Sequence, residues 1–152
     1  DKLKAEPVPY LQEPLYSLVS ALRFEPFLKG YDVKDAFFQV MLGPSLSSMC
    51  TLHFPDSTAT TTKLMMFKYM PYGMTLSSLI LDFCVTDTIK NLPIKNPNTK
   101  HIHYVDDLAQ LAKSTDDFFD LNECTSPNGL PLTTEDILSE DKTTFYGVTL
   151  TD

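Results

Sequence analysis

The amino-acid sequence predicts an α+β domain built on an antiparallel sheet, and three observations support this prediction. The chain has 152 residues, which is about the length of one domain. Hydrophobic residues make up 43% of it and charged residues 21%, which is typical of a folded globular protein. Short β-rich runs are interleaved with amphipathic helical patterns, and turn-rich segments separate them.

The first part of the chain predicts an arm, a helix and a strand. Residues 1–14 hold three prolines and no regular period, which indicates an extended N-terminal arm. Residues 13–24 carry apolar side chains at helical spacing and predict a short amphipathic helix. Residues 28–33 predict a strand with Asp32 at its far end, and residues 34–40 form a tight segment after it.

The middle of the chain predicts a hairpin followed by the longest helix. Residues 49–54 and 63–69 are β-rich runs joined by a Thr/Ser-rich connection, so we expect them to pair. Thr75 can cap a helix in which the 3.6-residue period continues over residues 76–92. The longest apolar run, around this helix start, is interrupted by polar residues, so we expect no membrane span.

The last part of the chain predicts a hairpin with an acidic tip. Residues 101–105 and 108–111 are short β-type runs joined through Asp106 and Asp107. After them the sequence predicts a brief helix over 114–121 and strands over 130–134 and 143–150.

The acidic tip requires a compensating partner. Adjacent carboxylates repel each other and weaken a strand, whereas a divalent cation would bind both of them at a twisted hairpin tip. Asp32, at another strand end, could supply a third oxygen ligand. Mg²⁺ prefers carboxylates with substrate phosphates, and a pair of such ions promotes phosphoryl transfer. The alternative is that Asp106 and Asp107 form a solvated turn and that Asp32 is an ordinary loop residue.

Other side chains have two interpretations. Phe37 and Phe38 are either core aromatics or one of them faces a cleft, and Tyr72 is either a site residue or a turn aromatic. His101 and His103 alternate with an apolar residue, which favours the exposed face of a strand over a metal site. Four methionines favour adaptable core over a binding surface, namely Met65, Met66, Met70 and Met74.

Charge bears on the binding of polyanions, and cysteine content bears on the redox compartment. The formal net charge is −8 and Arg23 is the only arginine, so this segment alone is a poor binder of polyanions. The three cysteines are widely spaced and form no CxxC pair, which favours a reducing, intracellular setting.

Four blocks in this order resemble the palm of reverse transcriptases: residues 31–40 (YDVKDAFFQV), 70–75 (MPYGMT), 104–107 (YVDD) and 145–148 (FYGV). The form of the second block and the YVDD string most resemble retrotransposons of the BEL/Pao type. The resemblance implies a polymerase palm, an antiparallel sheet backed by helices on one face. It would occupy residues 15–152 after the arm 1–14, with fingers, thumb and RNase H supplied by other parts of a longer polyprotein.

The resemblance also implies roles for individual residues. Asp32, Asp106 and Asp107 match the catalytic aspartates, and with the Val33 carbonyl they would hold two Mg²⁺ ions, or Mn²⁺ in their place. The residues that match the nucleotide site are Asp35, Ala36, Phe37, Tyr72 and Gly73. Phe37 would exclude a ribose 2′-hydroxyl. The residues that match the primer contacts are Tyr104, Phe145, Tyr146 and Gly147.

The implied function is RNA-directed DNA synthesis by two-metal nucleotidyl transfer from deoxynucleoside triphosphates to a primer 3′-hydroxyl on an RNA or DNA template. We expect a cytoplasmic retroelement particle with nuclear access, and an isolated segment that is inactive without fingers and thumb. The connection between Asp107 and Gly129 is short for the family, which indicates a gene fragment, a decaying copy or a truncated gene. The rival interpretations are a domesticated, inactive palm that binds a protein partner, and a free-standing cation binder or nuclease.

Overall fold

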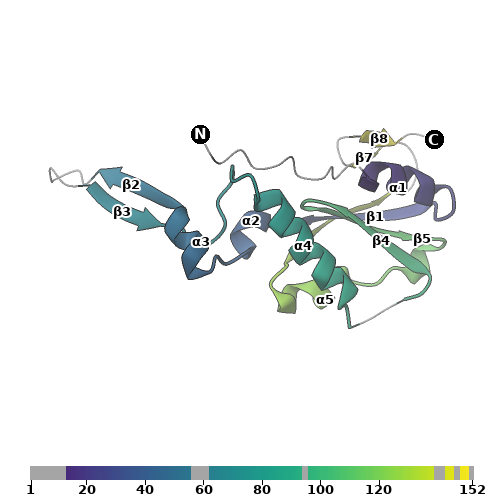
Figure 1. Ribbon diagram of the computed structural model, residues 1–152. Coiled ribbons are helices and arrows are strands. Elements are labelled where there is room, and N and C mark those ends of the chain that lie inside the picture. The colour runs from purple at the N-terminus through teal and green to yellow at the C-terminus, as the bar shows by residue number, and fades with distance from the viewer. Residues whose placement is uncertain (1–12, 56–61, 94–95, 139–142, 146–147, 151–152) are drawn as a thin grey trace.

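A computed structural model describes residues 13–55, 62–93, 96–138, 143–145 and 148–150 (Figure 1). The predictions for residues 1–12 and for Tyr146 and Gly147 lie outside these ranges. The described elements are α1 (Glu13–Leu22), β1 (Phe27–Val33), α2 (Ala36–Gln39), α3 (Pro44–Met49), β2 (Thr51–Pro55), β3 (Thr62–Met66), α4 (Ser77–Lys90), β4 (Thr99–Tyr104), β5 (Asp107–Ala112), α5 (Leu121–Thr125), β6 (Leu132–Leu138), β7 (Thr143–Phe145) and β8 (Val148–Leu150). Two short 3₁₀ turns flank α5, at Thr115–Asp117 and Ser126–Asn128.

A four-stranded antiparallel sheet in the order β4-β5-β1-β6 forms the centre of the molecule. β1 pairs with β5 on one side and with β6 on the other, so the strand that carries Asp32 near its end is central. β4 pairs with β5 as the predicted hairpin and forms an edge of the sheet. The α+β fold of a polymerase palm, predicted from the sequence, is confirmed.

Alternation along β1 divides the core between the two faces of the sheet. Tyr31 and Val33 point to the face covered by α4 and α5. Leu28 points to the opposite face, where Leu18 of α1 packs against it at the end of β1 away from Asp32. Helices α4 and α5 therefore back one face as expected, and α1 adds a smaller cluster on the other (Figure 1).

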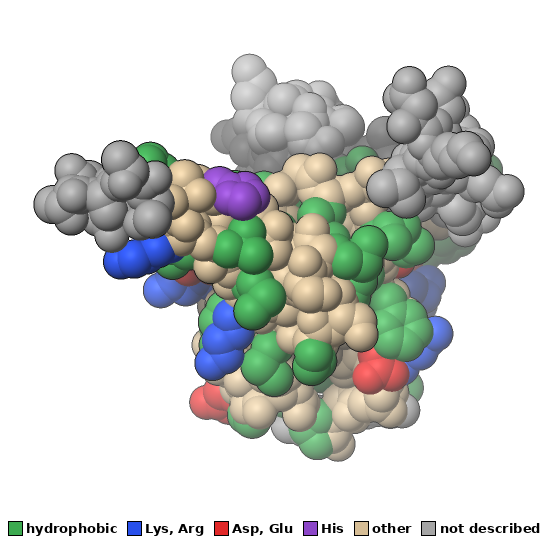
Figure 2. Space-filling view, turned by 60° about the vertical axis from the view of Figure 1, so that its left-hand side comes forward, with side chains coloured by type: hydrophobic (Ala, Val, Ile, Leu, Met, Phe, Trp, Pro, Cys, Tyr) green, Lys and Arg blue, Asp and Glu red, His purple; other side chains and the backbone are tan. Residues whose placement is uncertain are grey.

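The β2–β3 hairpin projects from the sheet and leaves apolar side chains exposed. The two strands pair antiparallel, as predicted (Figure 1). Met65 and Met66 are 54% and 62% exposed, whereas Met70 is fully buried, so the methionines do not form one core cluster as expected. The end of the molecule that carries this hairpin, turned toward the viewer in Figure 2, shows several hydrophobic side chains on its surface.

Three local predictions are wrong. The N-cap of α4 is Leu76 rather than Thr75, and it makes no side-chain cap bond. The helix expected over 114–121 is absent at that place. Instead α5 begins after Asp120, whose carboxylate accepts hydrogen bonds from the N–H groups of Asn122 and Glu123. Residues 143–150 contain two short paired strands, β7 and β8, where the sequence predicted one.

Among the helices that the structure describes, none is long and apolar enough to cross a bilayer.

Candidate active site

The three predicted catalytic aspartates lie at one end of the central sheet. Asp32, near the end of β1, stands directly opposite Asp107, the first residue of β5. Asp106 precedes Asp107 in the turn, and its carbonyl accepts a hydrogen bond of 3.0 Å from the Val33 N–H. Antiparallel pairing therefore brings together residues that are more than 70 positions apart in the sequence.

The turn that carries Asp106 has an unusual backbone. β4 ends at Tyr104 and β5 begins at Asp107, so Val105 and Asp106 are the two turn residues. Val105 has a φ of 56°, in the left-handed region that β-branched residues rarely adopt. Such strain persists where the surroundings hold it, and the partly buried Val105 side chain packs against the main core.

Electrostatic repulsion is already present among these carboxylates. Partial burial raises the pKa of Asp32, and the charge of Asp106 raises it further. A hydrogen bond from the Thr133 side chain lowers this pKa, and the more distant charge of Asp35 raises it. A positive charge placed between Asp32 and Asp106 would relieve the repulsion, which is the electrostatic condition for binding a cation.

The donor set is suited to a hard divalent ion. Carboxylate oxygens and a backbone carbonyl are ligands that Mg²⁺ and Mn²⁺ prefer, and Mg²⁺ usually takes only one or two carboxylates and completes its shell with water and phosphate. Within the described residues, no group of three or more acidic, histidine or cysteine side chains converges closely enough to form a closed metal site. Strand pairing thus brings the three aspartates to one end of the sheet, but the described side chains do not form a metal site.

Three aromatic rings form a second group, from α2 and from the turn before α4. The Tyr72 ring lies edge-to-face against Phe37 at 4.8 Å and against Phe38 at 5.4 Å between ring centroids. Phe37 also packs against the main core, whereas Phe38 and Tyr72 are exposed. Both phenylalanines lie on helix α2, where Phe37 contributes to the core and Phe38 is the exposed one of the two.

The backbone at this second group explains two residue choices. Gly73 has a φ of 84°, which favours glycine. Asp35 precedes α2 with a φ of 50°, a conformation that aspartate tolerates better than most residues. Ala36, the first residue of α2, is buried in the main core.

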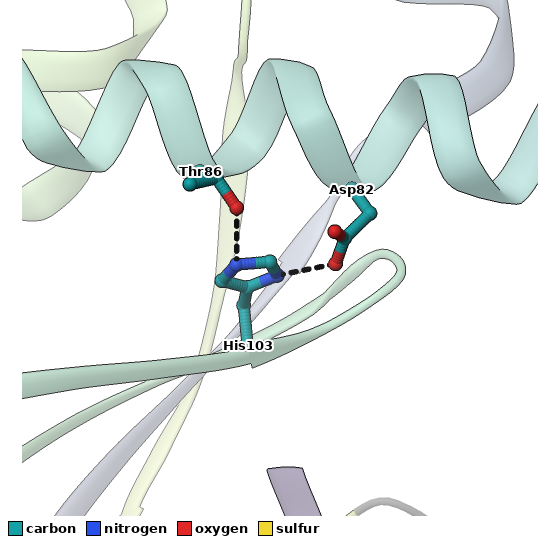
Figure 3. Close-up of polar contacts among 3 residues, drawn as sticks. All are labelled: Asp82, Thr86 and His103. Carbon is teal, nitrogen blue, oxygen red and sulfur yellow. Dashed lines mark hydrogen bonds and ion pairs between the residues drawn. The ribbon is translucent and has the colours of Figure 1, made fainter. Parts of the chain in front are cut away.

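The two histidines of β4 are not on an exposed face, which corrects the sequence-based prediction. His103 lies under α4, with Nε2 at 3.0 Å from the Thr86 hydroxyl and Nδ1 at 3.5 Å from an Asp82 carboxylate oxygen (Figure 3). The His101 ring packs edge-on against Phe119. Burial lowers the pKa of both histidines. The alternation of β4 was interpreted correctly, but α4 and α5 cover the face that was expected to be open.

Sequence reasoning missed Asp82 and Thr86. The two residues are separated by four positions on one helix and therefore share a face, which is the signal that could have indicated a common partner.

The chain also matches a known protein family. The family described as "Reverse transcriptase (RNA-dependent DNA polymerase)" matches residues 22–146, which include all three aspartates and the aromatic group. This chain belongs to the reverse transcriptase family.

Relatives of this reverse transcriptase chain include viral polyproteins. The Gag-Pol polyproteins of Rous sarcoma virus subgroup B (strain Schmidt-Ruppin) and of avian leukosis virus subgroup A (isolate RSA) are each 30% identical to it over 86 residues. The Gag-Pol polyprotein of Rous sarcoma virus subgroup C (strain Prague) has the same identity over the same length. The aligned segment is 56% of this chain but only 5% of each polyprotein.

The residues expected to contact the primer are described only in part. Tyr104 is 41% exposed, and it stands opposite Asp107 on the β4–β5 hairpin, so its backbone lies beside the acidic tip. Phe145 ends β7, while Tyr146 and Gly147 lie outside the described residues. Their contact with a primer stays a prediction.

Proposed function

We propose that this chain is the catalytic core of an RNA-directed DNA polymerase of a retroelement. The observation that carries the proposal is the placement of Asp32, Asp106 and Asp107 at one end of the sheet. Support comes from the match to the reverse transcriptase family over residues 22–146 and from the viral Gag-Pol relatives. The subgroup we propose is the BEL/Pao type, from the form of residues 70–75 and 104–107.

The aspartates supply the charge that this reaction needs. Asp32, Asp106 and Asp107, with the Val33 carbonyl, would hold two Mg²⁺ ions, or Mn²⁺ in their place. When bound, these ions favour deprotonation of the primer 3′-hydroxyl and stabilise the departing pyrophosphate. In the reaction the primer 3′-oxygen bonds to the α-phosphorus of a deoxynucleoside triphosphate, and the bond from that phosphorus to the β-phosphate oxygen breaks.

The residues around the aspartates would position the substrates. The backbone N–H groups of Asp35 and Ala36 would face the triphosphate, and Phe37 would exclude the ribose 2′-hydroxyl by its bulk. Tyr72 and Gly73 would lie over the incoming nucleotide. Residues 104 and 145–147 would brace the primer end on an RNA or DNA template.

The acidic chain requires further parts for this activity. A net charge of −8 disfavours a polyanionic template, so basic fingers, a thumb and an RNase H would come from a longer polyprotein. We place this polyprotein in an intracellular retroelement particle with access to the nucleus.

The test is primer extension on an RNA template with the segment joined to its flanking fingers and thumb. Asp106→Asn should abolish extension, whereas the control Asp116→Asn should not, because Asp116 is exposed in a distant 3₁₀ turn. A folded parent that extends no primer, or an Asp106→Asn variant as active as the parent, would refute the proposal and leave an inactive palm.

A further inference from the structure

The acidic tip is supported on only one side by backbone hydrogen bonds. β4, which leads into the tip, is an edge strand of the described sheet and pairs only with β5. An edge strand is more easily displaced than a central one, because half of its backbone groups have no strand partner. On the β4 side, the tip is therefore held by side-chain contacts of β4, because no second strand pairs there in the described sheet.

His103 makes these contacts from a position three residues before Asp106. Asp82 and Thr86 lie one turn apart on α4, and the imidazole of His103 lies between them (Figure 3). The side chains of His103 and Asp82 are 17% and 25% exposed, so the pair is largely removed from solvent. We call this set of three residues the His103 clamp.

One histidine tautomer fits both neighbours. With its proton on Nδ1, the imidazole leaves Nε2 to accept a hydrogen bond from the Thr86 hydroxyl, and Nδ1 lies beside the Asp82 carboxylate without forming a hydrogen bond to it. The 3.0 Å contact to Thr86 has hydrogen-bond geometry, whereas the 3.5 Å contact to Asp82 is mainly electrostatic. Two contacts with different requirements fix the ring more firmly than either one alone.

The helix that holds His103 is also joined to the aromatic group. The Ser77 hydroxyl, at the start of α4, donates a hydrogen bond of 3.0 Å to the Pro71 carbonyl, next to Tyr72. Leu81 of α4 is fully buried in the cluster against which Phe37 packs. Helix α4 is thus the element that connects the aromatic group with the acidic hairpin.

We propose that His103 is a positioning residue, whose clamp to Asp82 and Thr86 sets the acidic tip relative to the Phe37–Phe38–Tyr72 group. This inference rests on the proposed function for its catalytic consequence, but its structural consequence can be measured without activity. His103 itself touches no substrate. It acts by holding Asp106 and Asp107 at the distance from the nucleotide site that in-line transfer requires.

Hydrogen exchange at two neighbouring backbone amides reports the position of the tip in the 152-residue chain. The Val33 N–H donates to the Asp106 carbonyl at 3.0 Å, whereas the Lys34 N–H donates to the Pro131 carbonyl at 3.0 Å on the other side of β1. Displacement of the tip should speed hydrogen exchange at Val33 and leave Lys34 unchanged. The ratio of the two rates, measured by NMR, therefore separates local displacement from global loss of stability.

The variants change the clamp with little change in volume. His103→Leu removes both polar contacts and should raise the Val33-to-Lys34 exchange ratio about tenfold, the effect expected for losing a buried hydrogen bond. Thr86→Val removes one hydroxyl and should raise it several-fold. Thr88→Val is the matched control on the same helix, because the Thr88 hydroxyl bonds to the Cys84 carbonyl instead, and it should leave the ratio unchanged.

Activity of the polymerase that contains this chain gives the second readout. His103→Leu should lower kcat about tenfold and change the KM for the nucleotide by less than about twofold, because a displaced tip misaligns the transfer step more than it weakens nucleotide binding. An unchanged exchange ratio in His103→Leu and Thr86→Val, or an equal rise at Val33 and Lys34, would overturn the positioning role. If Asp106→Asn is as active as the parent, the proposed function fails, while the exchange ratio still decides whether the clamp positions the tip.

Discussion

Replacing Asp32 by asparagine should stabilise the metal-free chain at neutral pH. Asp32 stands directly opposite Asp107. Partial burial and then the charge of Asp106 raise the pKa of Asp32. Like charges opposed on neighbouring strands destabilise a sheet by about 0.2–1 kcal/mol. Because Asp32 is only partly buried and salt screens its charge, we expect a gain near the lower end of that range. Asparagine has almost the same shape, so little packing is lost.

The pH dependence of this gain has a definite sign. The folded-state pKa of Asp32 lies above its ordinary value of 3.8. The protonated carboxyl is therefore favoured in the folded chain, and the stability it contributes is complete below pH 3.8 and lost as pH rises through the folded pKa. The advantage of Asp32→Asn should be absent at pH 3 and complete at pH 7.

A divalent ion should reverse the order of stability. If the aspartates bind Mg²⁺, the parent gains about 2.7 kcal/mol at a free concentration 100 times the Kd, and the asparagine variant gains much less. Urea denaturation of both proteins and of the control Asp116→Asn, in EDTA and in MgCl₂, measures these differences. The reasoning fails if Asp32→Asn is the less stable protein in EDTA at pH 7, or if MgCl₂ stabilises it as much as the parent.

Three further predictions concern the core, the histidines and the nucleotide site. Leu81→Ala should lower the free energy of unfolding by about 2–5 kcal/mol because Leu81 is fully buried. Urea denaturation measures this loss beside that of the control Leu79→Ala, whose leucine is partly exposed. A loss in Leu81→Ala no larger than that in Leu79→Ala would contradict the prediction. Burial lowers the pKa of His101 and His103 below the usual 6.5, so their contribution to stability is complete above pH 6.5 and is lost as pH falls through the folded pKa values. The melting temperature should therefore be lower at pH 5 than at pH 7.5, and this difference should shrink in a variant with both histidines replaced by glutamine. In the restored polymerase, Phe37→Ala should raise incorporation of ribonucleotides relative to deoxynucleotides by about tenfold or more in single-nucleotide assays; unchanged discrimination would remove Phe37 from the sugar site.

The central strand and the acidic hairpin could be predicted because their signals are local. Residues 28–33 and 101–111 have β-type runs, and the structure forms β1, β4 and β5 at these places, with the turn at Val105 and Asp106 instead of Asp106 and Asp107. The resemblance to reverse transcriptases groups Asp32 with Asp106 and Asp107, and antiparallel pairing sets Asp32 opposite Asp107. The role of these residues as metal ligands stays a prediction.

The errors share a physical cause, which is competition between local signals and long-range packing. Asp120 forms a side-chain cap and α5 begins after it, at Leu121, whereas the helix predicted from Ser114 is only a short 3₁₀ turn over Thr115–Asp117. Thr75 has the right residue type for an N-cap, yet the chain enters α4 through Leu76 with the Ser77 hydroxyl bound to Pro71. The preference of a single residue is too weak to override such contacts.

The sequence by itself determined that successive residues of β4 point to opposite faces, that Asp32 lies near the end of a strand, and that Asp106 and Asp107 come shortly after Tyr104. Only the tertiary structure decided which face α4 would cover, and so placed His103 between Asp82 and Thr86 instead of in solvent. The physical reason is that a period of two fixes the alternation of side chains along one strand but carries no information about the elements that pack on either face.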